Sequence, residues 1–327
     1  MKAIIPVAGF GTRLRPHTLT KPKVLMSVAG KPMIHHIIEQ LISEKLVDSI
    51  ILVTGFMGNK IEKYLNHNFN FKFENAIQEE AKGLGHAIYC SKHLFDNNKP
   101  EDVIIILGDT LFDVNLSEMC KNDNSVIGVK KVEDPRRFGV VEKDSEGFVN
   151  KFIEKPSGPD VSLSNEAIVG LYYLKNSNLL FESLKSIIEK NIRTKNEFQL
   201  TDALSEMLIK KDKIVTYPVD GWLDCGKPET ILETNQYLLK KIQGKGNSNF
   251  QHKYSFVGDD CEINNSIIGE FTSVGNNCII INSIITNSII EPGSHIENAI
   301  IKDSIIGEKV TVKNKAQILN LGDYSEC

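Results

Sequence analysis

The sequence contains no hydrophobic run long enough to cross a membrane and no recognisable secretory signal. Its longest uninterrupted aliphatic stretch, residues 103–107, is far shorter than the roughly 20 apolar residues of a transmembrane helix. The apolar start of the chain is broken by Pro6 and Gly9 and lacks a small-residue cleavage site, which argues against a signal peptide. We therefore expect a cytoplasmic protein with no membrane partner.

An excess of one charge and a cysteine framework are also absent. The chain carries 38 Lys and Arg residues against 42 Asp and Glu residues, a formal net charge of -4. A general nucleic-acid binder would need a clustered excess of basic residues. The six cysteines are scattered and form no C-x-x-C pair, unlike the cysteines of a small disulfide scaffold. We expect reduced thiols and no nucleic-acid partner.

The remaining composition, 41% hydrophobic and 24% charged over 327 residues, is typical of a globular protein of about two domains. Residues 1–243 alternate short β-rich runs with helical stretches, which predicts an α/β domain built on a parallel sheet covered by helices. The expected order is strand 2–7, helix 32–45, strand 48–54, helix 85–93 and strand 103–107.

Four later β-rich runs indicate a second section of sheet inserted beside the first. These runs lie at residues 125–131, 139–143, 149–154 and 167–174. Two late helices, residues 200–211 and 228–241, close this domain. A stretch of Gly, Ser, Asn and Lys at residues 244–249 then predicts a linker.

The second domain, residues 250–327, has a different period. Aliphatic residues recur in steps of five or six, at Val257, Ile263, Ile268, Val274, Ile280, Ile285, Ile290, Ile296, Ile301, Ile306 and Val312. Such a hexapeptide-like repeat predicts a parallel β-helix, in which each short strand buries one aliphatic side chain. With three faces per coil, these rungs make three to four coils. A few ordinary strands are the alternative.

The first predicted strand is followed by a glycine-rich turn that is suited to phosphate. Glycines after a buried strand let the backbone approach a phosphate and point amides at it, while Arg13 and Lys23 supply countercharge. A dinucleotide fingerprint would need glycine in place of Leu14, and the spacing is not that of a P-loop. A near-match to a P-loop at residues 221–227 fails at Pro228. A plain strand-to-helix turn is the alternative.

This turn resembles the N-terminal signature of the sugar-1-phosphate nucleotidyltransferases, or nucleotide-sugar pyrophosphorylases, of the EC 2.7.7 class. The resemblance covers residues 2 to about 240 and is closest to long-form glucose-1-phosphate thymidylyltransferase-like proteins. Further motifs in family order are Gly83-Leu84-Gly85-His86-Ala87, Leu107-Gly108-Asp109, Phe138-Gly139-Val140-Val141, Glu154-Lys155-Pro156, Gly170-Leu171-Tyr172, Glu197-Phe198-Gln199-Leu200-Thr201-Asp202 and Gly221-Trp222-Leu223-Asp224-Cys225-Gly226. The implied fold is a Rossmann-like mixed sheet followed by a small left-handed parallel β-helix.

The resemblance also implies roles for individual residues. The implied nucleotide-binding residues are Ala8, Gly9, Gly11, Thr12, Arg13, Gln78 and Gly83. The implied sugar-phosphate-binding residues are Gly139, Glu154, Lys155 and Val169. Asp109 and Asp224 are the implied metal ligands, and Arg13, Lys23 and Asp109 the implied catalytic residues.

The chemistry implied by the resemblance agrees with these residue types. Joining a sugar 1-phosphate to a nucleoside triphosphate brings two polyanions together, so the site needs cations and fixed amide donors more than a covalent nucleophile. Mg2+ prefers carboxylates and water, and both Asp109 and Asp224 are expected at the mouth of the sheet. The implied reaction is an in-line attack of the sugar phosphate on the α-phosphorus, with release of pyrophosphate.

The sequence leaves the substrates and a second activity open. Gln78 with Gly83 is similar to the base reader of the thymidylyl and uridylyl branches, which ranks dTTP first and UTP second, with glucose 1-phosphate as the sugar. Residues 132–135 before Phe138 are similar to mannose-1-phosphate guanylyltransferases, which keeps GTP third. The β-helix also allows added sugar acyl transfer, although His295 is the only histidine inside the repeats. A catalytically inactive regulatory relative is a further alternative.

The last coil of a β-helix leaves an open edge that is usually capped or covered by association. Residues 318–327 form a short tail with apolar Ile318 and Leu319. We therefore expect a homo-oligomer to which the β-helices contribute.

Overall fold

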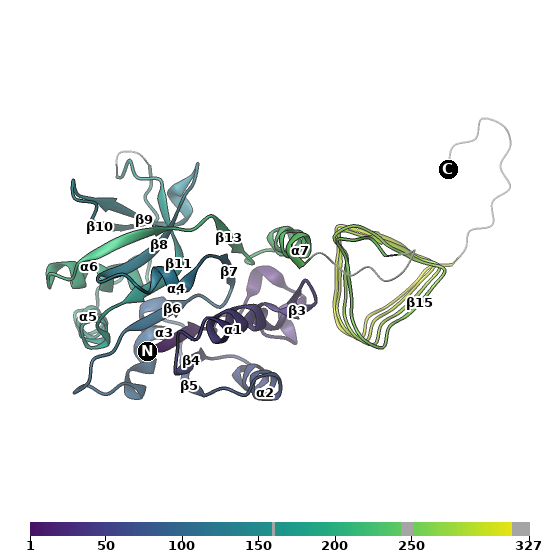
Figure 1. Ribbon diagram of the computed structural model, residues 1–327, viewed down its shortest axis with the longest axis horizontal. Helices are drawn as coiled ribbons and strands as arrows, with labels where there is room; N and C mark the ends of the chain where they lie inside the picture. The colour runs from purple at the N-terminus through teal and green to yellow at the C-terminus, as the bar shows by residue number, and fades with distance from the viewer. Residues whose placement is uncertain (159–160, 243–250, 316–327) are drawn as a thin grey trace. The chain divides into compact units, whose positions relative to one another are not determined.

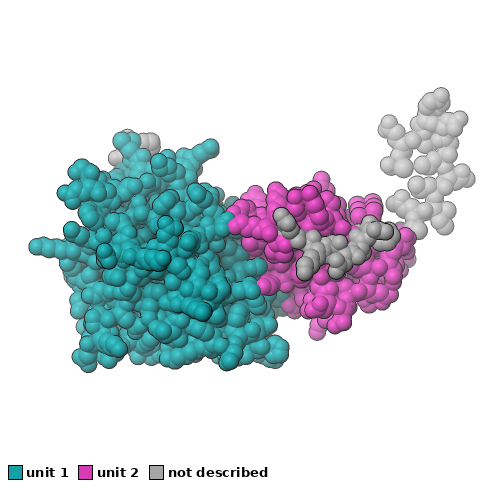
Figure 2. All heavy atoms as spheres, in the orientation of Figure 1, with its two compact units in different colours: residues 1–26, 32–227 teal, residues 27–31, 228–327 magenta. Residues whose placement is uncertain are grey.

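A computed structural model of the chain describes residues 1–158, 161–242 and 251–315. The chain divides into two compact units, Met1–Met26 with Pro32–Lys227 and Ser27–Lys31 with Pro228–Cys327 (Figures 1 and 2). The predicted linker at 244–249 and the predicted tail at 318–327 lie outside the described residues. The predicted domain boundary between residues 243 and 250 stays a prediction.

Four parallel strands form the centre of the first unit. They are β6 (Val103–Ile106), β1 (Lys2–Pro6), β4 (Ser49–Thr54) and β5 (Phe73–Ile77), hydrogen-bonded in that order. Every residue of β4 and β6 is buried, as in parallel strands that are covered on both faces. The predicted strands 2–7, 48–54 and 103–107 are confirmed to within one residue at each end.

The later strands lie beside the first section of sheet, as the sequence indicates, and are continuous with it. These strands are β8 (Ser125–Lys131), β9 (Gly139–Lys143), β10 (Val149–Glu154), β11 (Glu166–Leu174) and β12 (Ile214–Pro218). Strand β11 joins them to the centre because its first half pairs with β9 and its second half with β6. Gly170, with a φ of 87°, lies where β11 changes partner, and the result is one nine-stranded mixed sheet.

Helices cover this sheet and shape its core. They are α1 (Met33–Ser43), α2 (Gly58–Asn68), α3 (Leu84–Cys90), α4 (Leu116–Met119), α5 (Ser177–Glu189) and α6 (Leu200–Ile209). Helices α3, α5 and α6 share one buried cluster with the sheet. Helices α2, α4 and α5 were not expected from the sequence. No described helix combines the length and apolar character that a membrane span requires.

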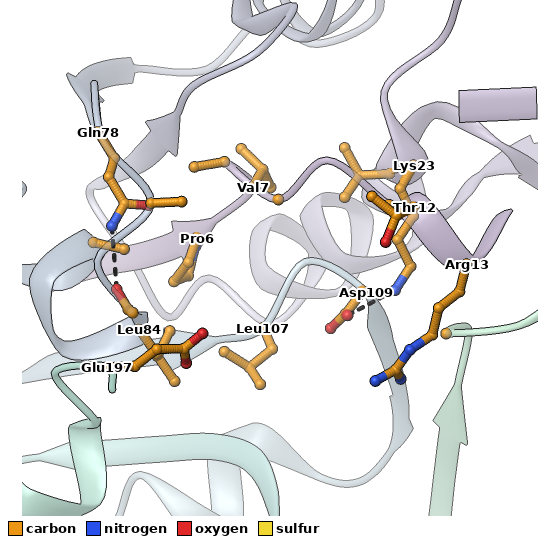
Figure 3. Close-up of a pocket in the computed structure, with 18 of the residues that line it drawn as sticks. Pro6, Val7, Thr12, Arg13, Lys23, Gln78, Leu84, Leu107, Asp109 and Glu197 are labelled. Atoms are coloured by element: carbon orange, nitrogen blue, oxygen red, sulfur yellow. Dashed lines mark hydrogen bonds and ion pairs between the residues drawn. The ribbon is translucent and has the colours of Figure 1, made fainter. Parts of the chain in front are cut away.

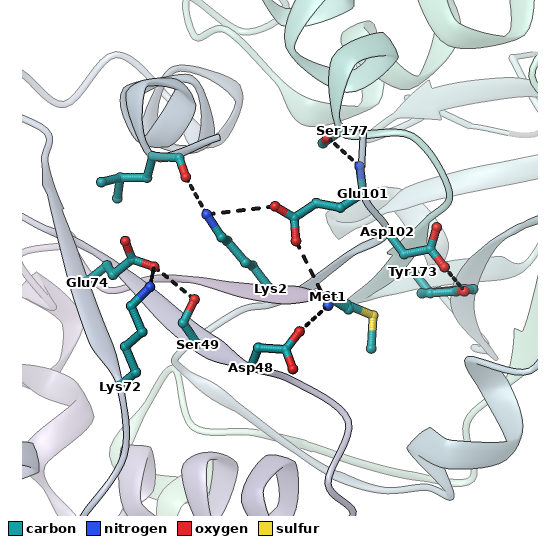
Figure 4. Close-up of polar contacts among 11 residues, drawn as sticks. Met1, Lys2, Asp48, Ser49, Lys72, Glu74, Glu101, Asp102, Tyr173 and Ser177 are labelled. Atoms are coloured by element: carbon teal, nitrogen blue, oxygen red, sulfur yellow. Dashed lines mark hydrogen bonds and ion pairs between the residues drawn. The ribbon is translucent and has the colours of Figure 1, made fainter. Parts of the chain in front are cut away.

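Polar contacts hold the amino-terminal end of the central strand (Figure 4). The Lys2 ammonium lies 3.7 Å from the Glu101 carboxylate and also donates to the Leu94 carbonyl. Beside it, Ser49 donates to Glu74 at 2.8 Å. These contacts leave the carboxyl end of the strand, where Pro6 is followed by the glycine-rich turn, as the end that is open to a ligand.

The second unit contains the predicted β-helix. Its eleven described strands are β14 (Phe256–Val257), β15 (Glu262–Asn264), β16 (Ile267–Ile268), β17 (Ser273–Val274), β18 (Ile279–Ile281), β19 (Ile284–Thr286), β20 (Ile289–Ile290), β21 (His295–Glu297), β22 (Ile300–Lys302), β23 (Ile305–Ile306) and β24 (Thr311–Lys313). They form three parallel sheets of four, four and three strands. The eleven aliphatic residues that the period identified stack in register along these sheets and form its core, which confirms the prediction.

Helix α7 (Pro228–Ile242) and the hairpin of β2 (Ser27–Val28) and β3 (Lys31–Pro32) complete this part of the fold. The fully buried Asn235 joins α7 to residues of the β-helix and the hairpin. Its Oδ1 accepts from Ala29 N at 2.8 Å and Ser273 Oγ at 2.7 Å, and its Nδ2 donates to Phe271 O at 2.9 Å.

Replacing Asn235 by Leu is expected to lower the free energy of unfolding of the second unit. The substitution removes the partner of three polar groups, of which the buried Ala29 N and Ser273 Oγ each cost about 1–3 kcal/mol when left unpaired. Urea denaturation followed by circular dichroism measures the loss. Glu233→Ala, an exposed change on the same helix, is the control, and equal midpoints for the two variants would contradict this role of Asn235.

Candidate active site

The turn after β1 forms one wall of a cavity at the carboxyl end of the sheet (Figure 3). The cavity has a volume of about 590 Å³. All the residues with predicted nucleotide-binding roles line it, namely Ala8, Gly9, Gly11, Thr12, Arg13, Gln78 and Gly83. Lys23, Asp109, Lys155 and Asp224 line it as well.

The turn owes its shape to Gly11. This residue has a φ of 60°, and a Cβ there would lie 2.9 Å from Thr18 Cγ2 and 3.1 Å from Lys23 Cβ. Its carbonyl accepts from Leu14 N at 2.9 Å and Thr18 Oγ1 at 2.8 Å. These contacts fold the short 3-10 helix η1 (Thr12–Leu14) so that Thr12 and Arg13 remain exposed while Leu14 is buried.

The opposite wall is the loop before α3. Gly83 has a φ of 108°, and a Cβ there would lie 2.7 Å from the Phe198 carbonyl. Gly85 N donates to that same carbonyl at 2.8 Å, and Phe198 N donates to Lys82 O at 2.9 Å. Glycine is therefore required where this loop packs against the backbone around Phe198, and the buried Gln78 is held beside it.

A two-stranded antiparallel ribbon brings the two predicted metal ligands together. Strand β7 (Thr110–Asp113) pairs with β13 (Gly221–Asp224), with Asp224 opposite Thr110. Cys225 N also donates to the Asp109 carbonyl at 3.1 Å. Asp109 and Asp224, far apart in the sequence, thus lie on neighbouring strand ends at the floor of the cavity.

The charged side chains of Lys23, Asp109 and Asp224 interact with one another at the floor of the cavity. Lys23 Nζ lies 2.7 Å from Asp109 Oδ2. Although the Asp224 side chain is open to the cavity, desolvation and the negative charge of Asp109 raise its pKa, while Lys23 and Arg137 lower it. A carboxylate held beside another carboxylate favours a bound cation.

These carboxylates fit Mg2+ better than a softer metal. The described residues contain no group of three or more His, Cys, Asp or Glu side chains placed to hold a metal, which speaks against an all-protein metal cage. Mg2+ is commonly held by one or two carboxylates together with water and substrate phosphates. Asp109 and Asp224, both oxygen donors, match that pattern.

A second cavity, of about 580 Å³, lies beside the first. Its walls include the predicted sugar-phosphate residues Gly139, Glu154, Lys155 and Val169. Glu154 is largely buried, accepts from Thr201 Oγ1 at 3.1 Å and lies 3.2 Å from Lys155 Nζ. Lys155 has a φ of 47°, a strained backbone conformation of the kind that concentrates at functional sites.

Two residues of the second cavity were missed by the sequence reasoning. Arg137 ends a short 3-10 helix that Asp134 caps, and it adds a cation to the cavity that Lys155 lines. Trp222 packs edge-on against Phe138 with ring centroids 4.9 Å apart, and its buried Nε1 has no hydrogen-bond partner among the described residues. Trp222 stood within a recognised motif, whereas nothing in the sequence singled out Arg137.

The two cavities share a wall. Arg13, Leu84, Leu107, Asp109, Lys155 and Asp224 line both. The shared wall therefore carries two cations and two carboxylates between two spaces of similar size. This arrangement lets two anionic ligands approach each other around a cation.

Comparisons with known proteins agree with this geometry. The family model described as nucleotidyl transferase matches residues 2–241. A bifunctional protein GlmU from Methanococcus vannielii is 35% identical over 79% of this chain and 60% of its own length, so the chain spans about 60% of that relative. A bifunctional sugar-1-phosphate nucleotidylyltransferase/acetyltransferase from Sulfurisphaera tokodaii is 30% identical over 98% of this chain and 83% of its own length.

A solved structure gives the same answer for the first unit. A UDP-glucose pyrophosphorylase complexed with UDP-glucose has a TM-score of 0.61 and 28% sequence identity, covering 73% of this chain and 98% of its own. The fold, the shared wall and these similarities agree. The chain belongs to the nucleotidyl transferase family, in its group of sugar-1-phosphate nucleotidyltransferases.

Proposed function

We propose that this protein joins a sugar 1-phosphate to a nucleoside triphosphate and releases pyrophosphate. The observation that carries the proposal is the wall shared by the two cavities. There Arg13, Lys155, Asp109 and Asp224 lie between the cavity formed by the glycine-rich turn and the cavity that contains Glu154. A binding protein for one nucleotide would not need the second cavity.

The residues of the shared wall have distinct tasks in this mechanism. Lys155 orients the sugar phosphate, and Lys23, already beside Asp109, neutralises the α-phosphate under attack. Arg13 stabilises the charge that develops on the departing pyrophosphate. Glu154, held by Thr201, accepts hydrogen bonds from sugar hydroxyls. No general base is needed because the attacking phosphate is already ionised at neutral pH.

Members of this family generally use a divalent metal, and we assign Mg2+ to this chain. Asp109 and Asp224 would hold it. When bound, the ion neutralises phosphate charge and fixes the phosphates for in-line displacement.

The substrates follow from the base loop and from the relatives' names. A buried glutamine with a free carbonyl oxygen suits a uracil or thymine base, and the structural neighbour is named a UDP-glucose pyrophosphorylase. We therefore place UTP ahead of dTTP, the reverse of the order that the sequence favours, and keep glucose 1-phosphate as the sugar.

A substrate panel tests the activity. Purified protein with Mg2+ is assayed for pyrophosphate release with UTP, dTTP, GTP, CTP and ATP against glucose, N-acetylglucosamine and mannose 1-phosphates. We expect release with UTP or dTTP and glucose 1-phosphate. Release with GTP and mannose 1-phosphate would reassign the substrates, and no release with any pair would refute the proposed activity.

Sugar acetyl transfer is a second candidate because two relatives are named as bifunctional. Within the described β-helix, His295 Nε2 is buried without a hydrogen-bond partner and lies 3.6 Å from Glu297. Release of free coenzyme A from acetyl-CoA in the presence of glucosamine 1-phosphate tests this activity separately.

Asp109→Asn or Asp224→Asn is expected to reduce turnover at least a hundredfold without unfolding the protein, because each removes a charge from the metal site and no packing contact. Pyrophosphate release and thermal denaturation measure the two effects. Asp220→Asn, an exposed change just before β13, is the control. Normal turnover in both site variants would remove the metal assignment.

Arg13→Ala is expected to lower kcat by about a hundredfold or more, with little change in the affinity for sugar phosphate, because it removes charge stabilisation from the leaving group. Steady-state kinetics with each substrate varied in turn separates these effects. Arg15→Ala removes an exposed arginine that lines neither cavity. If Arg13→Ala weakens only the binding of sugar phosphate, Arg13 contacts the sugar phosphate and not the departing pyrophosphate, and the prediction is wrong.

We further propose that two copies associate through the β-helix. Ile267, Ile284 and Ile300 are stacked in register on one outer face and are 48%, 41% and 83% exposed. Parallel coils repeat this apolar ladder, so the same face of a second copy is complementary to it.

Ile284→Lys is therefore expected to shift the full-length protein toward monomer while retaining nucleotidyl transfer, because it places a charge in the centre of the apolar ladder. Light scattering reports the mass. Thr311→Lys introduces the same side chain at an exposed position of another sheet. A monomeric unmodified protein would contradict the association.

A further inference from the structure

The amide of Gln78 is held in one orientation by two acceptors. Its Nε2 lies 3.1 Å from the Gly83 carbonyl oxygen (Figure 3) and 3.1 Å from Nδ1 of His86. A carbonyl oxygen can only accept, so the amide group facing it is the NH2. Both amide hydrogens are then used, and Oε1, which has no partner among the described residues, remains as an acceptor at the first cavity.

This arrangement requires a neutral His86. Its Nδ1 accepts the second amide hydrogen, so Nε2 carries the ring proton. Protonation would turn Nδ1 into a donor facing the NH2 group. The amide of Gln78 could rotate to avoid this donor–donor conflict. Its Oε1 would then face the carbonyl oxygen of Gly83, and two acceptors would oppose each other. Protonated His86 therefore leaves no satisfactory orientation for Gln78.

The surroundings of His86 favour its neutral form. Desolvation lowers its pKa from the ordinary value of 6.5, Lys82 and Arg193 lower it further, and Glu80 opposes them. On its own helix, the Cys90 thiol lies 3.9 Å from Nδ1, and burial raises the pKa of that thiol. The Phe198 ring stacks on the imidazole, with ring centroids 6.4 Å apart.

His86 acts at a distance from the base. It does not line the first cavity, but it lines a separate hollow of about 680 Å³ together with Ile77, Tyr89 and Lys92. The hollow gives solvent, and therefore protons, a route to the ring that does not pass through the first cavity. The side-chain contact that links His86 to a residue of the first cavity is its hydrogen bond with Gln78.

We propose that neutral His86 is a positioning residue that fixes Gln78 as the acceptor for the N3–H of a uracil or thymine base. The inference rests on the proposed function. Cytosine carries a lone pair at N3, so the same Oε1 repels it. Nucleotide affinity and the choice of UTP over CTP both depend on the hydrogen bond from Gln78 to His86, and both decline as His86 takes up a proton.

Equilibrium binding of UTP and CTP to the full-length protein, measured by calorimetry at pH 7.5, tests the positioning role. His86→Ala removes the acceptor and is expected to weaken UTP binding about tenfold, the effect of one hydrogen bond, and to narrow the preference over CTP. In kinetics it raises KM for UTP and leaves kcat and KM for sugar phosphate nearly unchanged. His86→Asn is expected to restore both, because Asn Oδ1 lies where Nδ1 lay. His93→Ala is the control, because His93, in the 3-10 helix Ser91–Leu94 after α3, lines the same hollow as His86 but not the first cavity.

The pH profile separates positioning from packing. As pH falls through the pKa of His86, below 6.5, the unmodified protein is expected to lose UTP affinity more steeply than His86→Asn, whose amide does not titrate. Ionisation of UTP itself is common to both. Equal UTP affinity in His86→Ala and the unmodified protein, or identical pH profiles, overturns the inference. An unmodified protein without preference for UTP or dTTP over CTP overturns the nucleotide assignment as well, and that failure is visible without any variant.

Discussion

The site depends on two like charges that the fold forces together. Asp109 ends the turn after β6, Asp224 ends β13, and the β7–β13 ribbon prevents them from separating. Desolvation and, after it, the negative charge of Asp109 raise the pKa of Asp224, and Lys23 offsets part of this rise. The ribbon therefore holds two negative charges where both cavities meet, and this place favours bound cations. The side chains of Arg13 and Lys155 line the same wall.

The two cavities that meet at these charges differ in their lining residues. The first is lined largely by backbone and small side chains, with Gly9, Gly11 and Gly83 in its wall, which suits a phosphate chain bound by amides. The second contains Glu154, Thr201 and Trp222, side chains that suit hydroxyl groups and a sugar ring. In the proposed function, two ligands of different chemistry meet at this charged wall, and a reaction between them needs no covalent nucleophile.

How much was predictable depended on whether the signal was local. The β-helix followed from its period because each coil repeats the same burial, and the central strands followed from continuous aliphatic runs. Helix α2 was not predicted because its buried residues are only Gly58, Ile61 and Leu65, which give a weak apolar period in the sequence. The β7–β13 pairing escaped because it joins two four-residue strands across a long stretch of chain, and short strands carry little periodicity. The motifs placed Asp109 and Asp224 in one site, but only this pairing explains why they meet.

In the second unit, contacts that occur once decide at which coil of the β-helix α7 and the β2–β3 hairpin pack. A β-helix offers nearly equivalent aliphatic coils, so apolar packing alone would let α7 and the β2–β3 hairpin dock at more than one coil. Buried polar partners remove that freedom. Asn235 meets Ser273 and Phe271, and the buried Glu291 accepts from Ser27 N at 2.9 Å and Ser27 Oγ at 3.1 Å. Docking one coil away would break both hydrogen bonds from Ser27 to this buried carboxylate, and losing hydrogen bonds to a buried charge is costly. These polar contacts, which occur at one coil, therefore fix the position of α7 and the hairpin along the β-helix, a position that the repeated apolar packing leaves undefined.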